Sequence, residues 1–192
     1  MSNINDFIIE DGILTGYNGN DTEVVIPDGV TKIEDYAFSY NESLKSVVIP
    51  NSVTCIGFSS FDGCLSLETV MIGNSLTTIS DNAFDECKSL ANITLPSSLT
   101  AIGCMAFHGC LSLKNVIFNN TEDWEIYYQG FDESTGDDDG DGMEMYFNKI
   151  CNPSSDDLSD SVKAAEYIKK YCVNYYWCCR DTSYLEYMKS FQ

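Results

Sequence analysis

The repeat that decides the fold is visible in two consecutive stretches of this chain. Residues 47–69 read VVIPNSVTCIGFSSFDGCLSLET, and residues 70–92 read VMIGNSLTTISDNAFDECKSLAN. Apolar residues keep this 23-residue step in both directions along the chain. The six rows in phase are Val24/Val47/Val70/Ile93/Val116, Ile26/Ile49/Ile72/Leu95/Phe118, Val30/Val53/Leu76/Leu99, Ile33/Ile56/Ile79/Ile102, Phe38/Phe61/Phe84/Phe107 and Leu44/Leu67/Leu90/Leu113. A fixed period of this length is the sequence signature of a repeat protein.

Within one repeat the hydrophobic period changes. Val47 and Ile49 alternate with the residue between them, which predicts a short strand with both side chains on one face. Ile56, Ser60 and Phe61 then fall at i, i+4 and i+5, a spacing that suits a short helical segment with one buried face. Each repeat is therefore predicted to contain one strand and one short helix.

A unit of this size cannot bury its own apolar face, but stacked units can. We therefore predict an α/β solenoid with about five strands in one parallel β-sheet along one side. The row Cys64, Cys87 and Cys110 keeps the same step, with Asn41 in the first repeat. Small buried thiols in register are expected to act as packing residues. This row, and the odd total of nine cysteines, favour reduced thiols over a disulfide framework.

The repeat motif Ile-Pro-x-x-Val-Thr-x-Ile-x-x-x-x-Phe-x-x-Cys-x-Ser-Leu resembles the BspA-type leucine-rich repeat. The resemblance covers roughly residues 20–118, about half of the chain. Members of that family are associated with bacterial and protist surface adhesion and with protein–protein recognition. The resemblance therefore implies a leucine-rich-repeat solenoid with an adhesion or recognition role, displayed at the cell surface or secreted.

The two ends of the solenoid need caps, because the terminal repeats would otherwise expose core residues. At the N-terminus, Asp11-Gly12 lies between two apolar runs and predicts a β-hairpin. At the C-terminus, helical spacing predicts one helix from Val162 to Tyr175 and a second from Tyr184 to Phe191. We expect these helices to cover the last repeat; the alternative is a partner-binding or self-associating element. The predicted divisions are an N-terminal cap (1–22), the leucine-rich-repeat solenoid (23–118), an acidic non-repeat segment (119–153) and a C-terminal helical aromatic cap (154–192).

The charge of the chain narrows the choice of partners. Thirty acidic residues against ten basic ones give a formal charge of −20 and a pI near 4.1. This charge repels nucleic-acid backbones and anionic membrane surfaces, so basic proteins or cations such as calcium are the better candidates. The N-terminus shows no basic and apolar export signal, and no window is apolar enough to span a membrane. From these features alone we expect a soluble, cytoplasmic chain.

One acidic stretch matches part of a calcium-binding motif. Asp137, Asp139 and Asp141, followed by Gly142, match positions 1, 3, 5 and 6 of an EF-hand-type loop over residues 137–148. Alternate carboxylates can converge on one hard cation in such a loop. Position 12 is Asn148, however, where the motif has a bidentate glutamate. A calcium-dependent binding module and a solvated acidic insertion both remain open.

The sequence contains little that predicts catalysis. The only histidine, His108, occupies the repeat position of Ser39, Asp62 and Asp85, which is variable and expected to be exposed. No phosphate-binding loop or nucleophile elbow is present, so we expect a non-enzymatic protein without a cofactor. The remaining enzyme hypothesis is a site in the Cys- and Tyr-rich tail over residues 172–180. A zinc site made by the cysteines of this tail together with Cys151 would match no established zinc-ligand spacing.

Strand alternation predicts a binding face. If the residues on either side of Val25 point inward, Val25 and its equivalents point outward. An apolar outward stripe then lies beside a polar one, and a contiguous exposed apolar patch commonly marks an interaction site. The alternative is that β-branched residues are there because they suit strands. The apolar stripe is Val25, Val48, Met71, Thr94 and Ile117, and the polar stripe is Glu23, Ser46, Thr69, Asn92 and Asn115.

Overall fold

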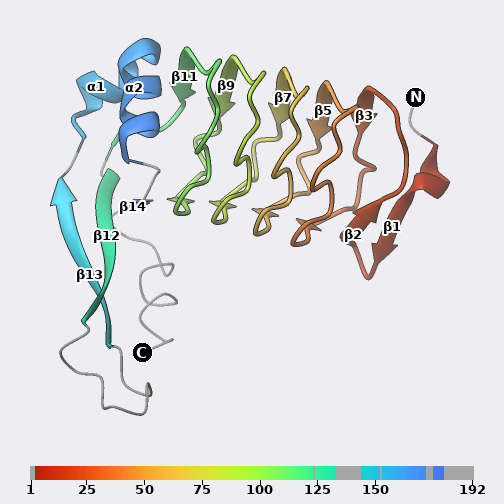
Figure 1. Ribbon diagram of the computed structural model, residues 1–192, viewed down its shortest axis with the longest axis horizontal. Helices are drawn as coiled ribbons and strands as arrows, with labels where there is room; N and C mark the ends of the chain where they lie inside the picture. Colours follow the sequence, from red (N-terminus) through yellow and green to blue (C-terminus); the bar gives the residue numbers. More distant parts are fainter. Residues whose placement is uncertain (1–2, 123, 133–143, 152, 172–174, 180–192) are drawn as a thin grey trace.

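The computed structural model describes residues 3–122, 124–132, 144–151, 153–171 and 175–179. It shows successive coils stacked along one axis, with a hairpin at the N-terminal end and two helices at the other (Figure 1). This architecture confirms the predicted leucine-rich-repeat solenoid with its two caps. Neither helix in the described residues is long and apolar enough to cross a membrane.

The N-terminal cap is the predicted hairpin. A 3-10 turn, η1 (Ile4–Asp6), leads into β1 (Phe7–Glu10), which pairs antiparallel with β2 (Ile13–Tyr17). The connecting residues Asp11 and Gly12 both have positive φ, at 49° and 79°. These are the values of a two-residue turn whose twist matches that of the flanking strands, which explains the Asp-Gly pair.

Five parallel strands form the predicted sheet along one side of the described solenoid. They pair in register at 23-residue steps; for example, Val47 lies opposite Val70. The inward row that contains these two residues is buried throughout. The strands are β3 (Glu23–Val25), β5 (Ser46–Ile49), β7 (Thr69–Ile72), β9 (Asn92–Leu95) and β11 (Asn115–Phe118). We call the outer surface of these strands the sheet face.

The prediction of a single parallel sheet is wrong, because each coil contributes a second, two-residue strand. β4 (Lys32–Ile33), β6 (Cys55–Ile56), β8 (Thr78–Ile79) and β10 (Ala101–Ile102) pair in parallel, and β2 continues them towards the hairpin. The threonine row stabilises this side. Thr54 Oγ1 donates to the Thr31 carbonyl, Thr77 Oγ1 to that of Thr54, and Thr100 Oγ1 to that of Thr77, at 2.9–3.2 Å. The strands were missed because two residues are too few to show a period.

The predicted helical segment is also wrong: the third side of each coil is built from turns. In every coil the residues two before and two after the phenylalanine have positive φ, which is incompatible with a right-handed helix. Backbone N–H groups here donate to the next coil, as Phe61 does to the Ala83 carbonyl at 2.8 Å. The positive-φ pairs are Tyr36/Tyr40, Ser59/Gly63, Asn82/Glu86 and Met105/Gly109.

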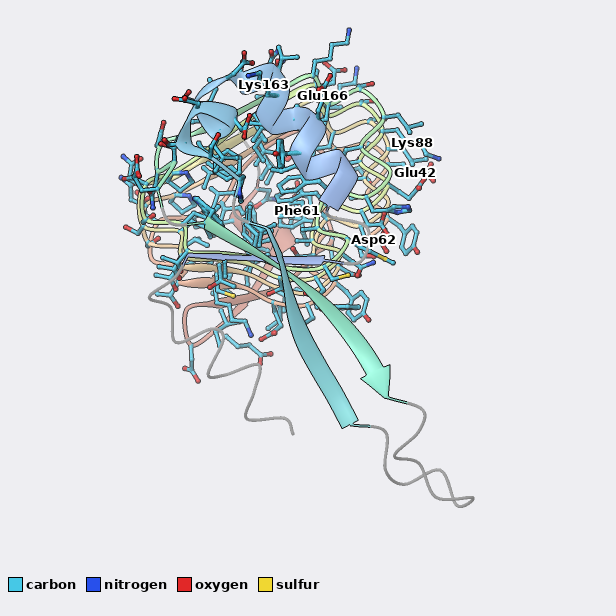
Figure 2. All side chains as sticks on the ribbon, turned by 90° about the vertical axis from the view of Figure 1, so that its left-hand side faces the viewer. Glu42, Phe61, Asp62, Lys88, Lys163 and Glu166 are labelled. Carbon is cyan, nitrogen blue, oxygen red and sulfur yellow. The ribbon has the colours of Figure 1, made fainter. Side chains whose placement is uncertain are left out.

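The core between the three sides is filled by the repeated apolar rows. The rings of Phe38, Phe61, Phe84 and Phe107 stack with centroids 5.0–5.4 Å apart and planes within 10° of parallel. Phe61 points into the interior of the solenoid when the molecule is viewed along its long axis (Figure 2). The cysteine row is buried beside these rings, as predicted, and each thiol donates to a backbone carbonyl at 3.2 Å.

Ser60 is an exception within another buried row. Its equivalents in the neighbouring coils are Ala37, Ala83 and Ala106, and among the described residues its Oγ is the one buried side-chain oxygen or nitrogen without a hydrogen-bond partner. A buried polar group without a partner costs about 1–3 kcal/mol. We expect Ser60→Ala to raise the free energy of unfolding by about 1 kcal/mol, measured by urea denaturation. Ser89→Ala is the control: it should be destabilising, because Ser89 Oγ donates to the Leu65 carbonyl at 2.7 Å.

The C-terminal region combines the first of the two predicted helices with a further short helix and with strands. α1 (Ser155–Ser159) begins at a capping box between Ser154 and Asp157, and α2 (Ser161–Tyr171) packs against β11. β12 (Trp124–Asp132) and β13 (Glu144–Cys151) form an antiparallel hairpin that projects from this end (Figure 1). β14 (Tyr175–Cys179) inserts between β10 and β12, so Tyr175 lies in a strand and not in the predicted helix. The predicted helix from Tyr184 to Phe191 lies outside the described residues.

Candidate functional site

The apolar stripe predicted on the sheet face is exposed. Parallel pairing places equivalent residues of successive strands side by side, about 4.8 Å apart. Val25, Met71 and Ile117 are 55%, 53% and 48% exposed, while Val48 is half-buried and Thr94 is exposed. Single exposed apolar residues are ordinary, but here three of them stand in one row across the sheet, on β3, β7 and β11.

The polar stripe lies beside it and ends at the C-terminal cap. Glu23, Thr69 and Asn92 are exposed, whereas Ser46 and Asn115 are half-buried. The Asn115 amide donates to the side-chain oxygen of Asn92 at 2.6 Å. Ser161 at the start of α2 donates to the side-chain oxygen of Asn115 at 3.5 Å. The cap therefore bounds the sheet face at one end and orients its last polar residue.

A shallow groove runs beside the apolar stripe, where the strands end. Val25, Val48 and Met71 line one side, and the turn that begins at Pro50 and its equivalents in neighbouring coils line the other. Side chains of these turns hold neighbouring coils together. Asn51 Oδ1 accepts from the Asn74 N–H at 2.8 Å. The groove is therefore lined by apolar side chains of the stripe and by hydrogen-bonded turns.

Three thiols of the solenoid, Cys64, Cys87 and Cys104, are poor nucleophiles. Burial raises the pKa of Cys64 to about 12 and that of Cys87 well above its usual range. Cys104 is half-buried, and desolvation raises its pKa to about 11. Because the thiolate is the reactive form, these groups stay protonated and inert near neutral pH.

The other predicted sites fall largely outside the described residues. Asp137, Asp139 and Asp141 do so entirely, so the calcium loop stays a prediction from the sequence. Asn148, its twelfth position, lies in β13 opposite Tyr128. Residues 172–174 and 180 of the candidate enzyme tail are likewise outside, and 175–179 form β14.

Sequence reasoning missed a cluster around His108. The histidine was expected to be exposed at a variable position, and its side chain is 42% exposed, but its Nδ1 lies 2.8 Å from Oδ1 of Asp85. A ligand atom of Glu86 completes a group of three, all within 4.8 Å of one another. The repeat contained the signal, because residues 23 apart lie side by side in successive coils.

Comparisons with known proteins agree with this fold. A family model described as a BspA type leucine-rich repeat region matches residues 9–135 in six copies. No curated protein matches the chain.

Three solved structures illustrate the likeness. A leucine-rich repeat protein of T. pallidum is 30% identical with a TM-score of 0.50, covering 60% of this chain and 70% of its own. One from Bacteroides capillosus is 28% identical with a TM-score of 0.54, covering 62% and 98%. The pneumococcal vaccine antigen PcpA is 26% identical with a TM-score of 0.57, covering 59% of this chain but only 29% of its own length.

Proposed function

Because this chain belongs to the BspA-type leucine-rich repeat family, we propose that it is a non-enzymatic recognition module that binds a protein through its sheet face. The observation that carries the proposal is the exposed apolar stripe across the sheet, with the groove along its edge. Repeat proteins commonly bind along such extended surfaces, because each coil adds one strand to a common face. On a protein displayed outside the cell, the same binding would serve adhesion.

The charge of the chain supports a partner with basic groups around an apolar contact. The formal charge of −20 attracts cationic proteins at long range and repels acidic ones. Long-range attraction raises the rate of encounter, whereas desolvation of apolar side chains supplies most of the affinity. Binding is therefore expected to weaken with salt, mainly through slower association.

Panning a random peptide library against the immobilised protein tests the proposal. Enriched peptides should combine apolar residues with net positive charge, and Met71→Asp should weaken their binding at least tenfold in calorimetry. Met71 lies in the central strand β7, so an acid there places a charge in the middle of the apolar contact.

Leu111→Asp is the matched control, because Leu111 is an apolar residue that is 75% exposed away from the sheet face. It adds the same charge and should leave the affinity unchanged. Peptides that bind equally well to the wild type and to Met71→Asp would contradict the sheet face as the site. Selection of acidic peptides would contradict the expected charge of the partner.

A further inference from the structure

The cluster on the third side of the solenoid contains the ligand types of a transition-metal site. Asp85 and Glu86 lie in one coil and His108 in the next, and the Glu86 N–H donates to the His108 carbonyl at 2.8 Å. That backbone bond fixes the two coils relative to each other at this point. One imidazole nitrogen and two carboxylate oxygens lie within 4.8 Å of one another. Two ligands of one zinc ion lie no more than about 4.4 Å apart, because each is about 2.0–2.2 Å from the metal, so a side-chain adjustment would bring the three atoms to one ion.

Both carboxylates are oriented by donors outside the cluster. Asn82 Nδ2 donates to Oδ2 of Asp85 at 3.1 Å, so Oδ1 faces the imidazole of His108. Lys88 Nζ lies 2.8 Å from Oε2 of Glu86, which leaves Oε1 on the side of the cluster. Side chains that hydrogen-bond to metal ligands in this way orient the ligands and tune the affinity for the metal.

Gly109 makes room for the Glu86 carboxylate. A Cβ at residue 109 would stand 2.5 Å from Oε1 of Glu86, and the backbone there has a φ of +69° that disfavours other residues. The carboxylate therefore lies directly over the backbone next to His108. In the preceding pair of coils the same arrangement places the Tyr40 ring over Gly63. In both pairs of coils, the glycine leaves space for one side chain of the preceding coil. Over Gly109 this side chain is the carboxylate of Glu86.

Negative charge is in excess around the cluster. Asp62 lies in the same row, one coil before Asp85, and desolvation together with the charge of Asp85 raises the pKa of its carboxyl group. Lys88 is the cation paired with the cluster, and Figure 2 shows Asp62 and Lys88 on the same side of the solenoid. A bound divalent cation would offset this repulsion, which a single ammonium group leaves partly uncompensated.

We propose that Asp85, Glu86 and His108 form a binding site for a divalent transition-metal ion such as Zn²⁺. The imidazole selects against Ca²⁺ and Mg²⁺, which prefer oxygen ligands, and favours ions that accept nitrogen and oxygen together. The ion would bind the Nδ1 lone pair of a neutral imidazole that carries its proton on Nε2, so it would replace the hydrogen bond between Nδ1 and Oδ1. Three protein ligands leave at least one coordination position for water or for a side chain of another molecule. The site lies on the turn side of the coils and does not depend on the sheet face.

The single histidine of the chain makes the test specific. In ¹⁵N-labelled full-length protein, NMR of the imidazole nitrogens reports on His108 alone, whatever the nine cysteines bind. Titration with ZnCl₂ should shift these signals with saturation. Asp85→Asn and Glu86→Gln should each weaken Zn²⁺ binding at least tenfold, because each removes a charged ligand. CaCl₂ at the same concentrations should leave the signals in place.

Glu42→Gln is the control, since Glu42 is an exposed carboxylate on the same side of the solenoid (Figure 2). It should leave Zn²⁺ binding unchanged, and thermal melts of all variants without metal establish that they fold. Imidazole signals that stay in place at millimolar Zn²⁺ would overturn the proposal. Equal Zn²⁺ affinity in the wild type and both ligand variants would also overturn it, because the histidine would then act alone.

Discussion

Replacing Phe61 by alanine is expected to lower the free energy of unfolding by about 3–5 kcal/mol. The ring is fully buried and stacks on both Phe38 and Phe84, with centroids 5.0 and 5.2 Å away. Its removal leaves a cavity between two coils whose backbones are tied together on all three sides, so the site cannot collapse to fill it. The measurement is thermal and urea denaturation, with a fall in melting temperature of roughly 10 °C for a chain of this size.

Phe58→Ala is the matched control for this substitution. Phe58 is the same residue type in the same coil, but it is 37% exposed and contacts the Tyr36 ring edge-on at 5.4 Å. Its loss should cost about 1 kcal/mol, as is usual for partly exposed side chains. Comparable losses for the two variants would mean that the stacked rings do not carry the stability assigned to them here.

Trp124→Ala is expected to cost a similar 3–5 kcal/mol, and also to change the association state. Trp124 begins β12, is almost fully buried, and packs edge-on against Phe118 of the last coil at 5.4 Å. Loss of this contact loosens the cover over the end of the core, and uncapped repeat proteins tend to associate. Urea denaturation measures the loss in stability, and size-exclusion chromatography with light scattering measures the association.

Trp124→Phe separates the two contributions of this side chain. It keeps most of the buried ring but removes the Nε1–H group that donates to the Asn120 carbonyl at 3.0 Å. We expect a cost of about 1–2 kcal/mol and an unchanged, monodisperse elution profile. Association of the phenylalanine variant to the same extent as the alanine variant would contradict a capping role for the ring itself.

The buried rows of the repeat were predictable, because each residue type recurs where the same contact recurs. The rows of Val47 and Phe61 therefore predict the sheet and the buried core from the sequence alone. The turn side was not predictable, because Tyr40, Asn82 and Glu86 adopt positive φ without being glycine. Inter-coil hydrogen bonds impose that conformation, and no local pattern contains them.

The C-terminal region shows the same limit. Residues 161–171 form a helix as their spacing predicts, but the strand at 175–179 depends on the edge of β10, which is more than 70 residues earlier in the chain. An open strand edge attracts a pairing segment whatever the local spacing suggests. The His108 cluster was missed for a related reason. Asp85 is one repeat step from His108, but the pairing of their side chains depends on how two neighbouring coils stack.

The equal step of all three sides has a consequence for how such a protein can change in length. Each coil hydrogen-bonds only to the coils before and after it, and Ile33, Ile56 and Ile79 occupy equivalent places in them. An in-frame duplication of one repeat would therefore insert a coil that meets the same neighbours on both sides. It would lengthen the sheet face by about 4.8 Å and leave both caps as they are. Duplication of a whole repeat is therefore expected to give a longer protein that still folds.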